Sequence, residues 1–276
     1  MTSHVPNVLS IAGSDPSGGA GIQADLKTFA ALGAYGCAAL TALTAQNTVE
    51  VSAVLPVPAD FLRQQLETVF SDVRVDAVKI GMLGTADAVR TVAAVLHAYR
   101  PPWVVLDPVL RATAGARLLD ADALAVLRDE LLPLVTIITP NAREAGELLG
   151  IAPPQSVADA RVAAERLLSC GAPAALITGG HLGDSDVCVD VLHDGHILWE
   201  LSVPRVPGAR GHGTGCTLSS AVAALLAQGC LLPQACAEAQ QFVAASIRRG
   251  ADLRVGRGAG PVHQLGELWT RAVASR

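Results

Sequence analysis

Short aliphatic runs alternate with amphipathic stretches along most of the chain. The aliphatic runs predict strands at residues 8–12, 35–43, 76–80, 103–106, 136–138 and 174–178. The amphipathic stretches and the apolar segments near the end predict helices at residues 22–32, 60–71, 86–99, 156–170, about 217–229 and about 233–250. Strands that helices cover on both faces read as continuous aliphatic runs, so this alternation indicates an α/β fold with a mostly parallel central sheet.

A β-hairpin is expected late in the chain. Two apolar runs, residues 187–192 and 197–203, flank Asp194 and Gly195. An Asp-Gly pair between apolar runs is a strong signal for a tight hairpin turn. No repeat, linker or change of composition divides the chain, so we expect one three-layer α/β/α domain over residues 1–276 with right-handed crossovers.

The composition narrows the possible functions. With 51% hydrophobic and 3% aromatic residues among 276, the core should be aliphatic. The net charge of −5 offers no basic surface for a nucleic-acid backbone, so we expect no nucleic-acid partner. No apolar run reaches the ~18 residues that span a bilayer, and the N-terminus lacks the basic start of a signal peptide. We therefore expect a cytoplasmic protein with no membrane partner.

The cysteines and histidines show no spacing typical of a metal site. The six cysteines include no Cys-x-x-Cys pair, and five of them are expected to be small buried apolar residues. The exception is Cys216, which follows a glycine-rich loop. The seven histidines are dispersed, and His212, the one beside this loop, is expected to be a packing residue.

The glycine-rich loop leads into a predicted helix, in the sequence GHGTGCTLSSAVAALL at residues 211–226. The first N–H groups of a helix have no partner within the helix and carry a partial positive charge, so they attract anions. Gly213 and Gly215 would let the backbone approach a phosphoryl group closely, because neither has a Cβ. Alternatively, the helix entry merely needs flexible residues, and this stretch alone leaves both interpretations open.

A second glycine-rich loop, residues 13–21, follows the first predicted strand. It is not a Walker A loop, because Gly19 stands where that motif requires lysine, and it does not match the dinucleotide fingerprint. We interpret it as a loop that closes over a small ligand, with Asp25 in the next helix as a hydrogen-bonding carboxylate. Alternatively, it is an ordinary strand-to-helix turn, and Asp25 is solvated or interacts with the helix start.

Polar residues follow other predicted strands, where open α/β sheets bind ligands. Gln46 could pair with the edge of a heterocycle, because an amide offers a donor and an acceptor, or it could be an exposed turn amide. Asp107 is a candidate for a magnesium or phosphate site, or it helps a turn. Asn141 and Glu144 share one face of a helix start and suit water-mediated magnesium binding, or they cap that helix.

Seven ordered motifs point to one family. They are IAGSDPSGGAGIQADLKT at residues 11–28, TAQNT at 44–48, KIGML at 79–83, DPV at 107–109, TPN with a following glutamate at 139–144, GGH at 179–181 and HGTGCT at 212–217. Over nearly the whole chain, they resemble the hydroxymethylpyrimidine and phosphomethylpyrimidine kinases of thiamine biosynthesis, in the ribokinase-like superfamily. The resemblance implies a ribokinase-like fold, MgATP as the phosphoryl donor, and successive phosphorylation of 4-amino-5-hydroxymethyl-2-methylpyrimidine and its monophosphate.

The resemblance also implies roles for individual residues. Gln46 would meet the edge of the pyrimidine, Asp25 and Met82 would lie in its pocket, and Asn141 with Glu144 would hold magnesium. The anion hole would consist of Gly213, Thr214, Gly215 and Cys216. The other site residues that we expect are Gly13 and Val109 at the pyrimidine, and Asp107, Thr178 and Gly180 at the nucleotide. We also expect a homodimer.

Three features depart from the pattern of the family. Thr178 stands where the family often has a lysine, and the only lysines of the chain lie elsewhere. Arg111 replaces a usual apolar residue after the DPV motif, and residues 208–211 replace a more polar run before the anion hole. Arg111 or Arg210 could supply positive charge to the ATP phosphates, or each could be a solvated surface residue.

The two expected substrates leave open what Cys216 does. A hydroxymethyl group must lose a proton to attack, whereas a phosphate monoester is already ionised, so only the first phosphorylation could need a base. At a helix N-terminus Cys216 could have a lowered pKa and serve as that base, or it could only shape the anion hole. Relatives that phosphorylate sugars have an aspartate base at this position, which argues against an ordinary sugar kinase.

Other functions fit parts of the sequence. A pyridoxal or pyridoxine kinase could use the same scaffold, because its substrate also has a ring with a hydroxymethyl group. A non-catalytic sensor that binds the pyrimidine is conceivable because of Thr178. A dinucleotide-dependent oxidoreductase fits the α/β class, but the chain lacks its fingerprint.

Overall fold

The computed structural model describes residues 4–112, 115, 117–180, 182, 186–206 and 211–269. The strands are β1 (Asn7–Ser14), β2 (Tyr35–Gln46), β3 (Val51–Pro56), β4 (Ala77–Ile80), β5 (Val104–Leu106), β6 (Ile137–Ile138), β7 (Ala175–Ile177), β8 (Val187–His193) and β9 (Leu198–Pro204). The helices are α1 (Gly21–Ala31), α2 (Ala59–Asp72), α3 (Ala86–Tyr99), α4 (Ala123–Val126), η1 (Leu127–Leu131), η2 (Leu132–Leu134), α5 (Ala142–Leu149), α6 (Val157–Ser169), α7 (Thr214–Ala227) and α8 (Leu232–Gly250).

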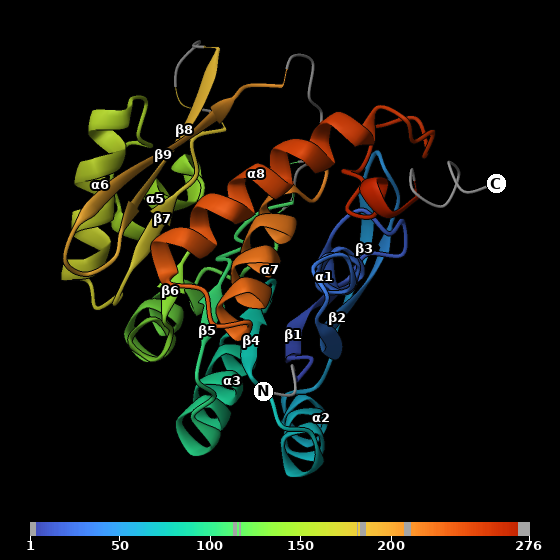
Figure 1. Cartoon of the computed structure of the whole chain (residues 1–276). Coiled ribbons are helices and arrows are strands. Elements are labelled where there is room, and N and C mark those ends of the chain that lie inside the picture. Colours follow the sequence, from blue (N-terminus) through green and yellow to red (C-terminus); the bar gives the residue numbers. More distant parts are fainter. Residues whose placement is uncertain are drawn as a thin grey trace.

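All of these strands belong to one sheet, in the order β3-β2-β1-β4-β5-β6-β7-β8-β9. The strands from β2 to β7 pair in parallel, whereas β3, β8 and β9 pair antiparallel at the two ends of the sheet. Helices cover both faces of the sheet, with α1, α7 and α8 on one side (Figure 1). The predicted α/β fold with a mostly parallel sheet is therefore confirmed. Within the described part of the chain, no helix is both long and apolar enough to cross a membrane.

Successive residues of the central strands face opposite helical layers. Val8 of β1 packs in a core cluster with Phe29 of α1 and with α7, whereas Leu9 packs in the cluster that includes α2 and α3. Side chains along a strand alternate between its two faces. The same alternation turns two polar residues, Ser10 and Lys79, toward α1 and α7, and both are fully buried. The interior beneath these two helices is therefore not purely apolar.

The structure adds elements that the sequence did not predict. β3 is mostly exposed, so it lacks the aliphatic run of a buried strand. Residues 123–134 form α4, η1 and η2, which have three different helical periods, and Pro133 lies within η2, so no single periodicity marks the segment. α7 begins at Thr214 rather than near Thr217. The end of the glycine-rich loop is therefore the first turn of this helix, and the predicted hairpin is present as β8 and β9.

Candidate active site

The residues of the motifs meet at the carboxyl ends of the parallel strands, beside the start of α7. A Cβ built on Gly13 would lie 3.1 Å from the Met82 sulfur, so the ends of β1 and β4 are in contact there. A Cβ on Gly215 would lie 3.8 Å from a carboxylate oxygen of Asp107. Val109 donates its N–H to the Asp107 carbonyl at 2.8 Å and holds the DPV turn. Segments far apart in the sequence thus form one cluster.

The N-terminus of α7 depends on a close contact between the two glycine-rich loops. Gly213 caps the helix with a positive φ of 87°, a conformation that favours glycine. A Cβ at Gly213 would lie 1.9 Å from the Gly19 carbonyl, so no other residue fits there. The N–H groups of Gly215 and Cys216 lie in the first turn, where a helix supplies no partner. This geometry suits an anion between the loop and Asp107.

A buried ion pair lies beneath this helix start. The Lys79 ammonium is 2.9 and 3.0 Å from the two oxygens of Asp25, and neither side chain is exposed. The hydroxyls of Ser10 and Ser220 donate to Asp25 at 2.6 and 2.8 Å. Burial opposes the charge on Lys79, but Asp25, Cys216 and Asp107 outweigh it and raise the pKa of Lys79 above its usual value. Asp25 thus joins β1, β4, α1 and α7.

The placement of Asp25 differs from the expected role in the pyrimidine pocket. A fully buried carboxylate that already binds an ammonium and two hydroxyls has no free surface for a ligand. The alternative of a solvated carboxylate is also wrong. The sequence held a signal for this pairing, because Lys79 interrupts an aliphatic run and a buried lysine requires a counter-charge.

Asp107 and Cys216 lie next to this ion pair. Asp107 is 4% exposed, lies 3.9 Å from the Lys79 ammonium and accepts a hydrogen bond from Ser219 at 3.3 Å. Burial raises the pKa of Asp107, and Asp25 adds to this while Lys79 opposes it. Burial also raises the pKa of the Cys216 thiol to about 12, with Lys79 again opposing and Asp107 contributing. Of the two alternatives for Cys216, the one with a lowered pKa is therefore wrong, because burial outweighs the helix N-terminus.

Asn141 and Glu144 form a reciprocal cap of α5. The Glu144 N–H donates to the Asn141 side chain at 3.0 Å, and the Asn141 N–H donates to the Glu144 carboxylate at 3.0 Å. This is the capping alternative that the spacing left open. Burial and the nearby charge of Asp107 raise the pKa of Glu144 to about 8. Asp107 and Glu144 each make a negative charge on the other less favourable, and a divalent cation bound between them would offset this repulsion.

The magnesium assignment stays a prediction. No three metal-binding side chains cluster in the described residues. Mg²⁺ usually keeps several waters and binds one or two carboxylates together with substrate phosphates. Asp107 and Glu144 fit that limited donor set.

Arg205 contacts the loop that follows Thr178, the position where the family often has a lysine. Thr178 donates its N–H to the Pro140 carbonyl at 3.0 Å and bridges to Asn141. The guanidinium of Arg205, at the end of β9, donates to the exposed Gly180 carbonyl at 2.7 Å and to the Leu182 carbonyl at 3.1 Å. The sequence did not predict this contact. Arg205 follows β9, and the antiparallel pairing of β9 with β8 brings it next to the loop that contains Gly180.

Arg111 and Arg210 were the two arginines considered as sources of positive charge at the ATP phosphates. Arg111 lies 3.5 Å from Glu147 of α5, so its charge is paired there. Arg210 lies outside the described residues, as does His181 of the GGH motif. The proposed role of Arg210 at the ATP phosphates is therefore not examined by the structure.

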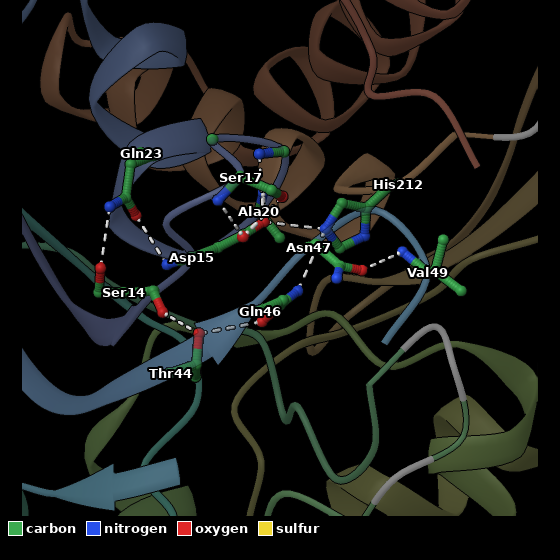
Figure 2. Close-up of polar contacts among 12 residues, drawn as sticks. Ser14, Asp15, Ser17, Ala20, Gln23, Thr44, Gln46, Asn47, Val49 and His212 are labelled. Carbon is green, nitrogen blue, oxygen red and sulfur yellow. Dashed lines mark hydrogen bonds and ion pairs between the residues drawn. The ribbon is translucent and has the colours of Figure 1, made fainter. Parts of the chain in front are cut away.

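The second glycine-rich loop is joined to the first by a buried hydrogen bond between Asp15 and His212. His212 Nε2 lies 2.9 Å from Asp15, and Gln46 lies on the other side of the same nitrogen at 3.4 Å (Figure 2). Burial disfavours the charge of Asp15, but hydrogen bonds from His212, Ser17 and Ala20 outweigh it and lower the pKa from 3.8 to about 2. His212 is buried and packs against Gly19, as expected for a packing residue, but its ring nitrogen also makes polar contacts with Asp15 and Gln46.

Comparisons with known proteins agree on the family. The phosphomethylpyrimidine kinase family matches residues 15–263. The chain is 46% identical to the hydroxymethylpyrimidine/phosphomethylpyrimidine kinase of Escherichia coli, over 95% of this chain and 98% of that protein. It is 49% identical to the thiamine biosynthesis bifunctional protein ThiED of Geobacter sulfurreducens, over 94% of this chain but 52% of that longer protein. Among solved structures, the pyridoxal kinase from Staphylococcus aureus in complex with AMP-PCP and pyridoxal has a TM-score of 0.86 at 37% identity, over 95% of this chain and 94% of that chain.

Removing Lys79 alone should destabilise the protein strongly. Lys79→Met would leave Asp25 buried without its counter-charge, and losing one partner of a buried pair costs about 3–5 kcal/mol. Urea unfolding measures this loss. The double variant Lys79→Met/Asp25→Asn removes both charges and should be more stable than Lys79→Met. Losses that simply add up would show that the two side chains do not act as a pair.

The charge of Asp15 should stabilise the fold above its unfolded pKa. Because the folded pKa is lowered from 3.8 to about 2, the contribution is fully present above pH 3.8 and is lost as the pH falls toward 2. The size is about 2 kcal/mol. Unfolding of wild type and Asp15→Asn, measured from pH 7 to pH 2, should show a difference that shrinks in acid. A difference independent of pH would contradict this, and Asp60→Asn on the exposed surface is the control.

Proposed function

The chain belongs to the phosphomethylpyrimidine kinase family, and we propose that it phosphorylates 4-amino-5-hydroxymethyl-2-methylpyrimidine and then its monophosphate, with ATP as the donor. The observation that carries this proposal is the start of α7, where Gly215 and Cys216 lie beside Asp107 and Asp107 lies 3.9 Å from the buried Lys79 ammonium. The family match adds the substrate class. The S. aureus pyridoxal kinase bound to AMP-PCP supports ATP as the donor.

Phosphoryl transfer requires in-line positioning and compensation of charge on the transferred oxygens, and little covalent chemistry from the protein. In our proposal the N–H groups of Gly215 and Cys216 donate to these oxygens. Thr178, Gly180 and Asp107 would lie at the nucleotide, and Gly13, Met82 and Val109 at the pyrimidine.

Magnesium would be held by Asp107 and Glu144, with Asn141 through water. When bound, it would neutralise negative charge on the phosphates. The raised pKa of Glu144 means that this side chain is uncharged more often at neutral pH than an ordinary glutamate. Its reciprocal cap with Asn141 holds the carboxylate at the start of α5, beside Asp107.

Only the first phosphorylation requires the removal of a proton from the attacking hydroxymethyl group. A thiol with a pKa of about 12 is protonated at neutral pH, so Cys216 would not start the reaction as a thiolate. Its hydrogen bond to Asp107 instead helps to hold that carboxylate. We therefore propose that Cys216 shapes the anion hole for both substrates.

We also propose that the protein acts in the cytoplasm and forms a homodimer. The edge strand β3 exposes Val54 and Leu55, and Leu43 of the paired strand β2 is exposed beside it. An exposed apolar edge is suited to pairing with a second copy. Sedimentation analysis of wild type and Leu55→Lys tests this association.

A pyridoxal kinase remains the competing function because of the likeness to the S. aureus enzyme. We expect ATP consumption with the hydroxymethylpyrimidine to exceed that with pyridoxal by at least about tenfold in kcat/KM. A coupled assay with both pyrimidines and pyridoxal, each alone, measures this. A reversed ratio would assign the protein to pyridoxal. Calorimetric binding of the pyrimidine without turnover in MgATP would indicate a sensor.

Cys216→Ala should slow both phosphorylations by similar factors, within about threefold of each other, because a misshapen anion hole affects both transition states. The measurement is kcat/KM for each purified substrate separately. A loss confined to the hydroxymethylpyrimidine would restore the thiol as the base. Cys230→Ala, far from the cluster on the loop after α7, is the control.

A further inference from the structure

The residues that follow α8 reach both the tip of the β2–β3 hairpin and the start of α7. Residues 251–264, all of which the structure describes, continue from α8 without a further helix or strand. In Figure 1 the red C-terminal part of the chain lies beside the end of the blue hairpin, and hydrogen bonds join the two. The same segment then contacts α7. We call residues 256–264 the C-terminal strap.

The first contact of the strap is with Thr48, at the tip of the hairpin and two positions after Gln46. Thr48 Oγ1 accepts hydrogen bonds from the N–H groups of Arg257 at 3.2 Å and Gly258 at 3.1 Å. A Cβ on Gly258 would lie 1.8 Å from the Thr48 carbonyl oxygen, and a Cβ on Gly256 would lie 2.1 Å from Thr48 Oγ1. The backbone of the strap therefore contacts the hairpin directly, and only glycine fits at these two positions.

The turn of the hairpin has hydrogen bonds of its own. The Asn47 side chain accepts from the N–H groups of Val49 at 2.8 Å and Glu50 at 3.0 Å, and these bonds close the turn locally (Figure 2). Arg257 and Gly258 are exposed, so water can replace Thr48 as the acceptor for their N–H groups. The contact with the strap therefore adds a fixed position of the hairpin tip rather than the turn itself.

The other end of the strap brackets residues 213–216, which form the proposed anion hole. The His212 N–H donates to the Gly260 carbonyl at 3.1 Å. The Gln264 amide donates to the Thr217 hydroxyl oxygen at 3.0 Å, and both of these side chains are buried. Because His212 directly precedes the range and Thr217 directly follows it, the strap holds the loop and the first turn of α7 from both sides.

We propose that the C-terminal strap sets the distance between the pyrimidine ring and the anion hole, with Thr48 and Gln264 as positioning residues at its two ends. One continuous segment contacts the hairpin that carries Gln46 and the start of α7. Phosphoryl transfer needs the attacking oxygen in line with the phosphoryl group, and a misplacement of about 1 Å can cost about a hundredfold in rate. This inference rests on the proposed function, in which Gln46 meets the ring and residues 213–216 meet the phosphoryl group.

The hold of the strap on the hairpin can be measured without substrate. Thr48→Val keeps the shape of the side chain but removes the acceptor, whereas Thr48→Ser keeps the acceptor. We expect Thr48→Val to speed hydrogen exchange about tenfold in peptides that cover residues 44–51 and 256–264, and Thr48→Ser to leave it unchanged. Mass spectrometry of the exchanged peptides measures this. Equal exchange in wild type and both variants would overturn the inference.

The positioning role is tested by separating the two substrates. Thr48→Val should lower kcat/KM for the hydroxymethylpyrimidine about tenfold and weaken its calorimetric Kd by a similar factor, while KM for ATP changes by less than about twofold. Thr48→Ser should restore both values. Ser52→Ala, on β3 of the same hairpin, removes a hydroxyl that donates to the Ala45 carbonyl at 2.9 Å, and it should behave as wild type.

A role confined to stability would give a different result. Thr48→Val would then lower the midpoint of urea unfolding, and the folded variant would bind the pyrimidine with the Kd of wild type, which would overturn the inference. An equal rise of KM for ATP and for the pyrimidine would overturn it too, because the strap would then have no specific effect on the hairpin side of the site.

Gln264→Met tests the other end of the strap, because methionine fills similar space without the amide. It should lower kcat/KM about tenfold for both pyrimidines. The double variant with Thr48→Val should lose less than the product of the two single losses, because release of either end already frees the strap. Losses that multiply would show two independent contacts and would overturn the single strap.

The proposed function and the strap can fail separately. Wild type that binds the pyrimidine in MgATP without turnover would contradict the proposed function. The calorimetric Kd of Thr48→Val would then decide about the strap. A Kd about tenfold weaker than that of wild type would support it, and an unchanged Kd would overturn it.

Discussion

The buried pair of Lys79 and Asp25 is the interaction on which the rest of the site depends. Both charges are removed from water, so each needs the other, and Asp25 also needs the hydroxyls of Ser10 and Ser220. These four residues come from two strands and two helices, and their bonds fix how α1 and α7 sit on the sheet. The ammonium lies 3.9 Å from Asp107 and offsets part of its negative charge. The charges beneath the start of α7 therefore contribute to the electrostatics of the proposed anion hole.

The glycines of the two loops also allow the loops to contact each other closely, in addition to the proposed close approach of a ligand to the backbone. Gly19 and Gly213 touch through backbone atoms, and His212 packs against Gly19 so closely that a Cβ there would lie 2.3 Å from the imidazole. A hydrogen bond between Asp15 and His212 then joins the same two loops. The close backbone contact and this hydrogen bond together hold the two loops in one relative position.

The sequence predicted the central strands and most helices because burial on both faces imposes long aliphatic runs and helical spacing. β3 was missed because it is exposed and carries no such pattern. The motifs that cluster beside the start of α7 could be found in the sequence, but the contacts between their residues could not. Asp25 of α1 was expected at a ligand, and its partner Lys79 lies 54 positions away on β4. The sequence left the pKa of Cys216 open, because the helix start was visible in it and the burial that raises this pKa was not. Arg205 reaches Gly180 only through tertiary pairing.

The hydrogen bonds between the N-terminal loops and the region of α7 join residues far apart in the sequence, and this affects when the protein can fold during translation. Asp15 and His212 are 197 positions apart, and Asp25 and Ser220 are 195 apart. A ribosome therefore completes the N-terminal strands and α1 long before α7 emerges, and non-local contacts of this kind form slowly. Until then Lys79 and Asp25 lack the helix that shields them from water. The candidate site can thus be completed only when the C-terminal segments have been synthesised, and a chain truncated before α7 would lack both the proposed anion hole and the helix that covers the buried charges.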